Sequence, residues 1–210
     1  DLKRIKGIEN FNTNEVSNMG EMFYDCGYLE ELDLSNFNTS KVITMERMFY
    51  SCYNLKQIRG LEHFNTNEVT NMYQMFFACH SIKSLNLTNF DTSSVTEMPQ
   101  MFYNCKSLKS LDLSSFNTTK MTAMYEMFYE CNSLVSLDLS SFDTSLVENM
   151  GNMFKGCTSL VYLNLSSFDT SNVVYFDNMF NACKSLQFLD ISNFNTSSGS
   201  TIDYMFNDCC

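Results

Sequence analysis

Residues 101–108 read MFYNCKSL, and variants of this phrase recur along the whole chain. They include MFYDCGYL at 22–29, MFYSCYNL at 48–55, MFFACHSI at 75–82, MFYECNSL at 127–134 and MFKGCTSL at 153–160. The Phe of the phrase recurs every 26 residues, with one interval of 27 between Phe49 and Phe76. A fixed period of this length is typical of stacked units that share one continuous core. The sequence therefore predicts an array of about eight units.

Cysteine and a second set of Phe residues follow the same period. One Cys stands three residues after each phrase Phe, and another Phe opens an FNTS or FDTS run in most units. Residues locked to a period in this way are expected to fill the same buried position in every unit. The predicted core residues are Phe23, Phe49, Phe76, Phe102, Phe128, Phe154, Phe180, Cys26, Cys52, Cys79, Cys105, Cys131, Cys157 and Cys183.

Each unit divides into two segments with different hydrophobic patterns. In residues 16–29 the apolar side chains fall on one arc of about 140° when plotted at ~100° per residue, which predicts an amphipathic helix. The Asn/Asp-Thr-Ser run before it offers oxygens that could cap that helix. Residues 29–37 alternate instead, with Leu32 and Leu34 on one face and Asp33 on the other, which predicts a short strand.

A strand and a helix repeated about eight times predict an α/β solenoid. We expect a right-handed stack with a parallel sheet on one face and helices on the other, because L-x-x-L-x-L is the leucine-rich-repeat pattern. The first and third units read IKGIENF and IRGLEHF, with an extra residue and a Gly. A local bulge or bend is expected at Gly7 and Gly60, since Gly tolerates backbone angles that other residues avoid.

The unit SLDLSSFDTSLVENMGNMFKGCTSL at 136–160 resembles the 26-residue repeat of bacterial surface proteins and mollicute lipoproteins, which is related to the BspA-like leucine-rich repeats. The resemblance covers essentially the whole chain. It implies a leucine-rich-repeat solenoid at the cell surface, in a family whose members are generally taken to act in adhesion or have no known role.

Charge and hydropathy limit the class of partner. A net charge of −11 argues against nucleic acid or an anionic membrane and favours either solubility or a basic partner. No apolar stretch is long enough to span a membrane, and the start, DLKRIKG, carries neither a signal peptide nor a lipidation motif. We expect residues 1–210 to be one array excised from a longer surface protein, with any membrane attachment through segments outside this chain.

The cysteine column allows three interpretations. In-register neighbours in a parallel stack lie ~4.8 Å apart, which fits a disulfide ladder poorly, because disulfides need Cβ atoms roughly 3.5–4.5 Å apart with a specific torsion. A metal track would need converging ligands, and the sequence has no C-x-x-C pair and only two His. Small apolar side chains in the core are the favoured interpretation.

Two surfaces are candidate binding sites. One is the outward face of the strands, where two aromatics stand near the C-terminal end. The carboxylates that recur on this face either hold cations or basic side chains or form a solvated polar surface relieved by interposed Asn and Arg. The other is the residue after each phrase Phe, which forms an aromatic column; this column fits either a docking surface or a seam of rings packed edge to face. The candidate binding residues are Tyr24, Tyr50, Phe77, Tyr103, Tyr129, Asp112, Asp138, Tyr162, Phe188 and Asp190.

A threonine recurs in every unit, for example Thr39 and Thr66. It is expected to cap the helix, and the alternative is the displayed threonine array of an ice-binding solenoid. The sequence shows no nucleophile motif, phosphate loop or distinctive carboxylate pair, so we expect no catalysis and no cofactor. The leading hypothesis is a non-catalytic module that binds a protein or host-surface ligand, and the alternative is a structural spacer or self-associating segment.

Overall fold

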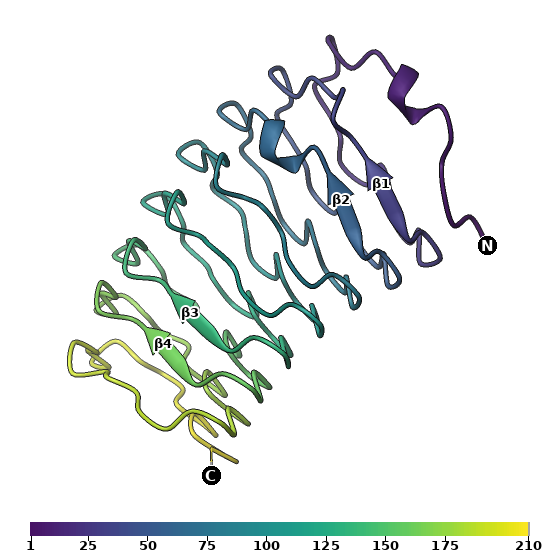
Figure 1. Cartoon of the computed structure of the whole chain (residues 1–210). Coiled ribbons are helices and arrows are strands. Elements are labelled where there is room, and N and C mark those ends of the chain that lie inside the picture. Colours follow the sequence, from purple (N-terminus) through teal and green to yellow (C-terminus); the bar gives the residue numbers. More distant parts are fainter. Residues whose placement is uncertain (210) are drawn as a thin grey trace.

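Residues 1–209 form a continuous stack of coils in the computed structural model, with the two ends of the chain at opposite ends of the stack (Figure 1). One side of the stack carries the short strands β1 (Glu31–Asp33), β2 (Gln57–Arg59), β3 (Ser136–Asp138) and β4 (Tyr162–Asn164). The 3₁₀ helices η1 (Ile8–Asn10) and η2 (Leu61–His63) precede the second Phe of their units. The strand side is called the sheet face below, and the opposite side the turn side.

The strands pair in parallel between successive units. Strand β1 pairs with β2 and β3 pairs with β4, with Glu31 opposite Gln57 and Ser136 opposite Tyr162. Leu32 points into the core as the alternation predicts. The strand is three residues long, shorter than the predicted 29–37, because the Asp33 carboxylate accepts a hydrogen bond from the Ser35 amide at 3.1 Å and turns the chain.

The predicted helix over 16–29 is wrong, and residues 1–209 contain no α-helix. The segment is a series of tight turns with left-handed residues at Glu21 (φ 58°) and Asp25 (φ 56°), which interrupt any helix. Their amides donate to the next unit, to the carbonyls of Glu46 at 2.9 Å and Tyr50 at 2.8 Å. Met22, placed in the buried arc by the helical pattern, is 36% exposed.

Gly7 and Gly60 occupy left-handed backbone immediately before the two 3₁₀ helices, each with φ 92°. The extra residue of these two units is accommodated in that turn. A Cβ atom at Gly60 would lie 2.5 Å from the Ser35 nitrogen of the preceding unit, so the close approach of the two coils requires glycine there.

The repeated threonine joins adjacent units, and the capping interpretation is wrong. Thr39 Oγ1 donates to the Asn65 carbonyl at 2.9 Å and accepts from the Asn65 amide at 2.8 Å. The neighbouring Asn38 carboxamide accepts from the Ser40 amide at 3.0 Å and forms the local turn instead. Thr66 is fully buried, which also contradicts a displayed ice-binding array.

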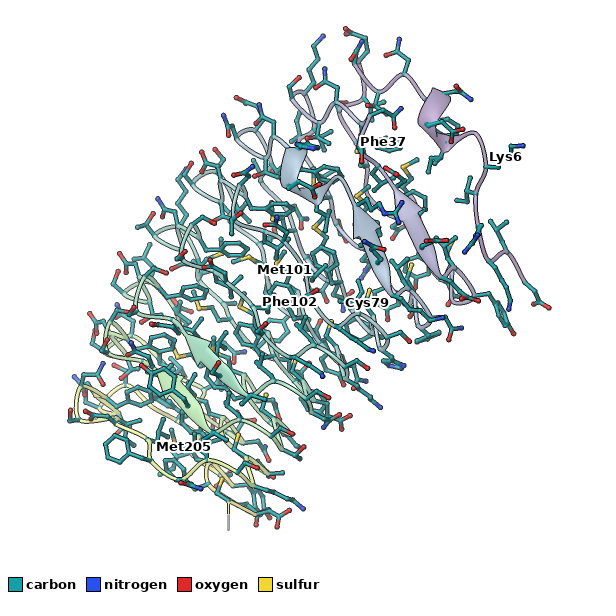
Figure 2. All side chains as sticks on the ribbon, viewed as in Figure 1. Lys6, Phe37, Cys79, Met101, Phe102 and Met205 are labelled. Carbon is teal, nitrogen blue, oxygen red and sulfur yellow. The ribbon has the colours of Figure 1, made fainter. Side chains whose placement is uncertain are left out.

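The phrase Phe residues form a column of parallel rings through the centre of the stack. Between Phe23 and Phe180, successive ring centroids are separated by 5.4 to 5.9 Å, with planes within 10° of each other. Figure 2 shows Phe102 and Met101 between the two sides of the coil, and both are fully buried. Each unit thus covers the ring of its neighbour.

The cysteines from Cys26 to Cys183 are free thiols, and those from Cys52 onward are fully buried whereas Cys26 is half-buried. Each buried thiol donates to a Phe carbonyl of the preceding unit, as from Cys131 Sγ to Phe102 O at 3.1 Å. No group of three potential metal ligands occurs within residues 1–209. Burial raises the pKa of Cys52 to about 12 and that of Cys131 well above its ordinary value. The cysteine is therefore both a space-filling core residue and an inter-unit donor.

Truncating one central ring should destabilise the stack strongly. Phe102→Ala removes a fully buried ring held between Phe76 and Phe128, and we expect a loss of about 3–5 kcal/mol in the free energy of unfolding. Phe188→Ala, at an exposed position, should change it by less than about 0.5 kcal/mol. Urea unfolding of both variants measures the difference, and equal midpoints would contradict the core assignment.

The left-handed positions predict stability changes of opposite sign in one column. Gly156 has φ 77° and Ala182, at the same position one unit later, has φ 60°. Gly156→Ala should lower the free energy of unfolding by about 1 kcal/mol, whereas Ala182→Gly should raise it by roughly 0.5 kcal/mol as left-handed strain is relieved. Thermal and urea midpoints compare the two; destabilisation by Ala182→Gly would argue against the strain.

Thiol labelling should follow burial. A raised pKa reduces the thiolate fraction at a given pH, and burial blocks the reagent. In the native protein at pH 8, Cys26 should react with a maleimide well before Cys79 or Cys131, both fully buried. Peptide mass mapping after timed labelling measures the order, with urea-unfolded protein as the control in which the rates converge. Equal rates in the folded protein would contradict this core.

Candidate functional site

The sheet face carries outward side chains in rows, because equivalent strand residues of successive units lie side by side. The row that begins at Glu31 continues through Gln57 and three serines to Tyr162 and Phe188. The row that begins at Asp33 contains the predicted residues Asp112, Asp138 and Asp190. The structure therefore gathers half of the sequence-predicted binding residues on one face and places the aromatic column on the opposite side of the coil.

Each carboxylate of the second row also forms a local turn. Asp138 Oδ1 accepts a hydrogen bond from the Ser140 amide at 3.0 Å, and Asp190 Oδ1 accepts one from the Ser192 amide at 3.0 Å. These hydrogen bonds lower the pKa of both carboxyls, so the side chains are ionised at neutral pH. Neither carboxylate, nor that of Asp112, forms an ion pair with any residue in 1–209.

The N-terminal part of the same face is electrostatically paired. Lys56 Nζ lies 2.8 Å from Glu30 Oε2, and Arg59 lies 3.8 Å from the Asp33 carboxylate. Arg4 pairs with Glu31. Charged side chains on this part of the face therefore form ion pairs within residues 1–209, whereas the carboxylates of the C-terminal part do not.

The C-terminal part of the sheet face exposes an apolar patch, defined here as Val135, Val161, Tyr162 and Phe188. Their exposed fractions are 49%, 45%, 54% and 77%. Tyr162, Val161 and Phe188 border a hollow of about 320 Å³ that also reaches Asn164 and Asp190. Large apolar side chains exposed together on a soluble surface are typical of interaction sites.

Sequence reasoning identified Tyr162 and Phe188 but missed Val135 and Val161. The equivalent position reads Lys56, Lys83 and Lys109 in earlier units, so the change from Lys to Val was available as a signal. It was missed because this position lies one residue before the short strand, where the alternation of buried and exposed residues has not yet begun.

The aromatic column on the turn side is a stack of parallel rings, so the expected edge-to-face geometry is wrong. From Tyr24 to Tyr129 the centroids are 4.3 to 4.7 Å apart and the planes lie within 8°. Lys155 Nζ lies 5.8 Å from the Tyr129 centroid and covers that end. The three inner rings, Tyr50, Phe77 and Tyr103, are each stacked between two neighbouring rings of the column and are half-buried. The column is therefore an inter-unit seam, and docking through its edges stays a prediction.

A polar ladder runs beside this column and was not predicted. Arg47 Nε donates to Gln74 Oε1 at 2.7 Å, Gln74 Nε2 to Gln100 Oε1 at 2.7 Å, and Gln100 Nε2 to Glu126 Oε2 at 2.6 Å. These side chains stand on left-handed residues. Because these side chains hydrogen-bond to one another, the ladder stabilises neighbouring units and leaves few polar groups available to a ligand.

The histidines do not form a catalytic arrangement. The His80 ring packs against Tyr53 with centroids 4.9 Å apart, and burial lowers its pKa, so the imidazole is neutral at pH 7. The His80 Nε2 atom is buried without a hydrogen-bond partner among residues 1–209. No helix within this part of the chain has the length and apolarity to cross a membrane.

Comparison with known proteins gives a family and a fold. The repeat pattern described as "Mycoplasma protein of unknown function, DUF285" matches residues 3–60, 56–137 and 133–210. The structure is similar to a leucine-rich repeat protein of T. pallidum, with TM-score 0.52, 21% identity and coverage of 80% of this chain and 69% of that one. It is similar to a leucine-rich repeat protein of Eubacterium ventriosum, with TM-score 0.52, 21% identity and coverage of 85% and 42%.

The chain thus spans about two thirds of the first of these proteins and less than half of the second. A leucine-rich cell surface protein of Faecalibacterium prausnitzii is more distant, with TM-score 0.44, 18% identity and coverage of 82% and 42%. No curated protein matches the chain. Three consecutive matches over nearly the whole sequence and the shared solenoid agree: the chain belongs to the DUF285 family of Mycoplasma proteins and has the leucine-rich-repeat solenoid fold.

Proposed function

We propose that the chain is a non-catalytic protein-binding module that acts in adhesion as one array of a bacterial cell-surface protein. The apolar patch is the observation that carries this proposal. Tyr162 and Phe188 are exposed at positions where three earlier units hold serine. Because the repeat folds with serine there, these aromatic side chains are not required by the core and are available to a partner.

Burial of the patch in an interface would contribute favourable free energy to binding. Tyr and other aromatic side chains dominate the energetics of protein interfaces when they become desolvated. The flanking carboxylates give a polar rim, which is the usual surround of such a patch. Surface location, and membrane attachment through segments outside this chain, belong to the proposal and rest on the family resemblance.

Loss of the patch should weaken binding strongly without unfolding the chain. We expect Tyr162→Ser with Phe188→Ser to weaken saturable binding to host cells or immobilised matrix proteins by roughly 30-fold or more, equivalent to about 2 kcal/mol. The control is Leu146→Ser with Tyr175→Ser, which removes exposed apolar side chains elsewhere. Circular dichroism and urea melting establish that both variants are folded.

A third variant separates the two candidate surfaces. Tyr50→Ser, Phe77→Ser and Tyr103→Ser together interrupt the aromatic column. Binding that survives in the patch variant but fails in a folded column variant would move the site to the turn side. Absence of binding by the unmodified protein would favour the spacer.

A further inference from the structure

The apolar patch has a charged neighbour that restricts the chemistry of its partner. Asp138 stands two residues after Ser136 in β3, and Asp190 stands two residues after Phe188 at the equivalent positions two units later, beside Tyr162 and Asn164 in the same hollow. Two residues of strand correspond to about 7 Å. An ionised carboxylate strip therefore runs beside the apolar strip, and both follow the axis of the stack.

These carboxylates lack the counter-charges that the N-terminal units supply. In the equivalent position Asp33 has Arg59 at 3.8 Å, whereas Asp138 and Asp190 have no cation within ion-pair distance among residues 1–209. Lys109 marks the border of the patch, beyond which its position is occupied by Val135 and Val161. The chain as a whole carries a net charge of −11. An acidic partner would meet repulsion here, and a basic one would meet attraction.

We infer that this surface binds a basic amphipathic helix, in which lysine or arginine side chains flank an apolar stripe. The inference rests on the proposed function and names the partner class for the same site. An α-helix lying along the stack presents two stripes side by side, as the two strips require. Asp138 and Asp190 are two units apart, or about 10 Å, which matches residues seven apart on a helix at about 10.5 Å.

The row itself provides a substitution that removes charge and keeps the turn. Asn164 stands between the two aspartates and its Oδ1 accepts from the Ser166 amide at 3.1 Å, as the aspartates do from their serines. Asp138→Asn with Asp190→Asn should therefore fold normally. Asp143→Asn with Asp169→Asn is the matched control, because each of those carboxylates accepts from a serine amide at 2.9 Å outside the strand row.

The test measures binding of three designed helical peptides by fluorescence anisotropy. The first has a leucine stripe flanked by lysines, the second has glutamate in place of lysine, and the third has serine in place of leucine. The unmodified protein should bind the first peptide at least about tenfold more tightly than either of the others. Asp138→Asn with Asp190→Asn should lose about tenfold for the first peptide and lose salt dependence, while the control pair changes by less than about twofold.

Other results overturn the inference in distinguishable ways. Equal losses in both Asn pairs would mean that net charge acts and the carboxylate strip does not. Equal binding of the lysine and glutamate peptides, or no binding of the lysine peptide, would reject a basic partner; the host-cell assay with the patch variant would still decide the proposed function. Sedimentation as a dimer that Phe188→Ser dissociates would make a second copy the occupant.

Discussion

Every unit of this protein must present to the following unit the same complementary surface that the preceding unit presents to it. The backbone meets this constraint by donating amides across the gap between coils, as from Glu21 to Glu46. The side chains meet it with rings and thiols that recur in register, as from Cys131 to the Phe102 carbonyl. Since one coil alone buries almost nothing, the interface between coils provides the stability, and the residue types that form it repeat.

The sequence revealed this interface better than it revealed the local backbone. The period, the number of units and the buried side of Leu32 follow from the positions of Phe and Leu alone. The helix over 16–29 was wrong because tight turns can bury the same residues that a helical wheel groups together. Asp25 belongs to a residue type that tolerates a positive φ, but Glu21 does not, and at both positions this conformation is stabilised by hydrogen bonds to the next unit, a non-local cause.

The candidate site shows the same division between pattern and context. The rows on the sheet face could be written down from the repeat, and Phe188 stands out in its row by residue type. Only the structure shows that Asp138 forms a turn with Ser140 and that, among residues 1–209, it has no cation beside it, unlike Asp33. The role of the aromatic column could also be assigned only from the structure, because the stacked geometry of Tyr103 and Tyr129 shows that the ring faces pack against each other.

The direction of the hydrogen bonds between coils has a mechanical consequence. They join one coil to the next along the stack, and the two ends of the chain lie at opposite ends of it (Figure 1). Tension applied through the ends pulls on these bonds coil by coil, so the outermost coil peels away while the remainder stays folded. Each released coil of 26 residues adds about 90 Å of contour length. An array of this design therefore lengthens in steps under load and absorbs work as each coil is released.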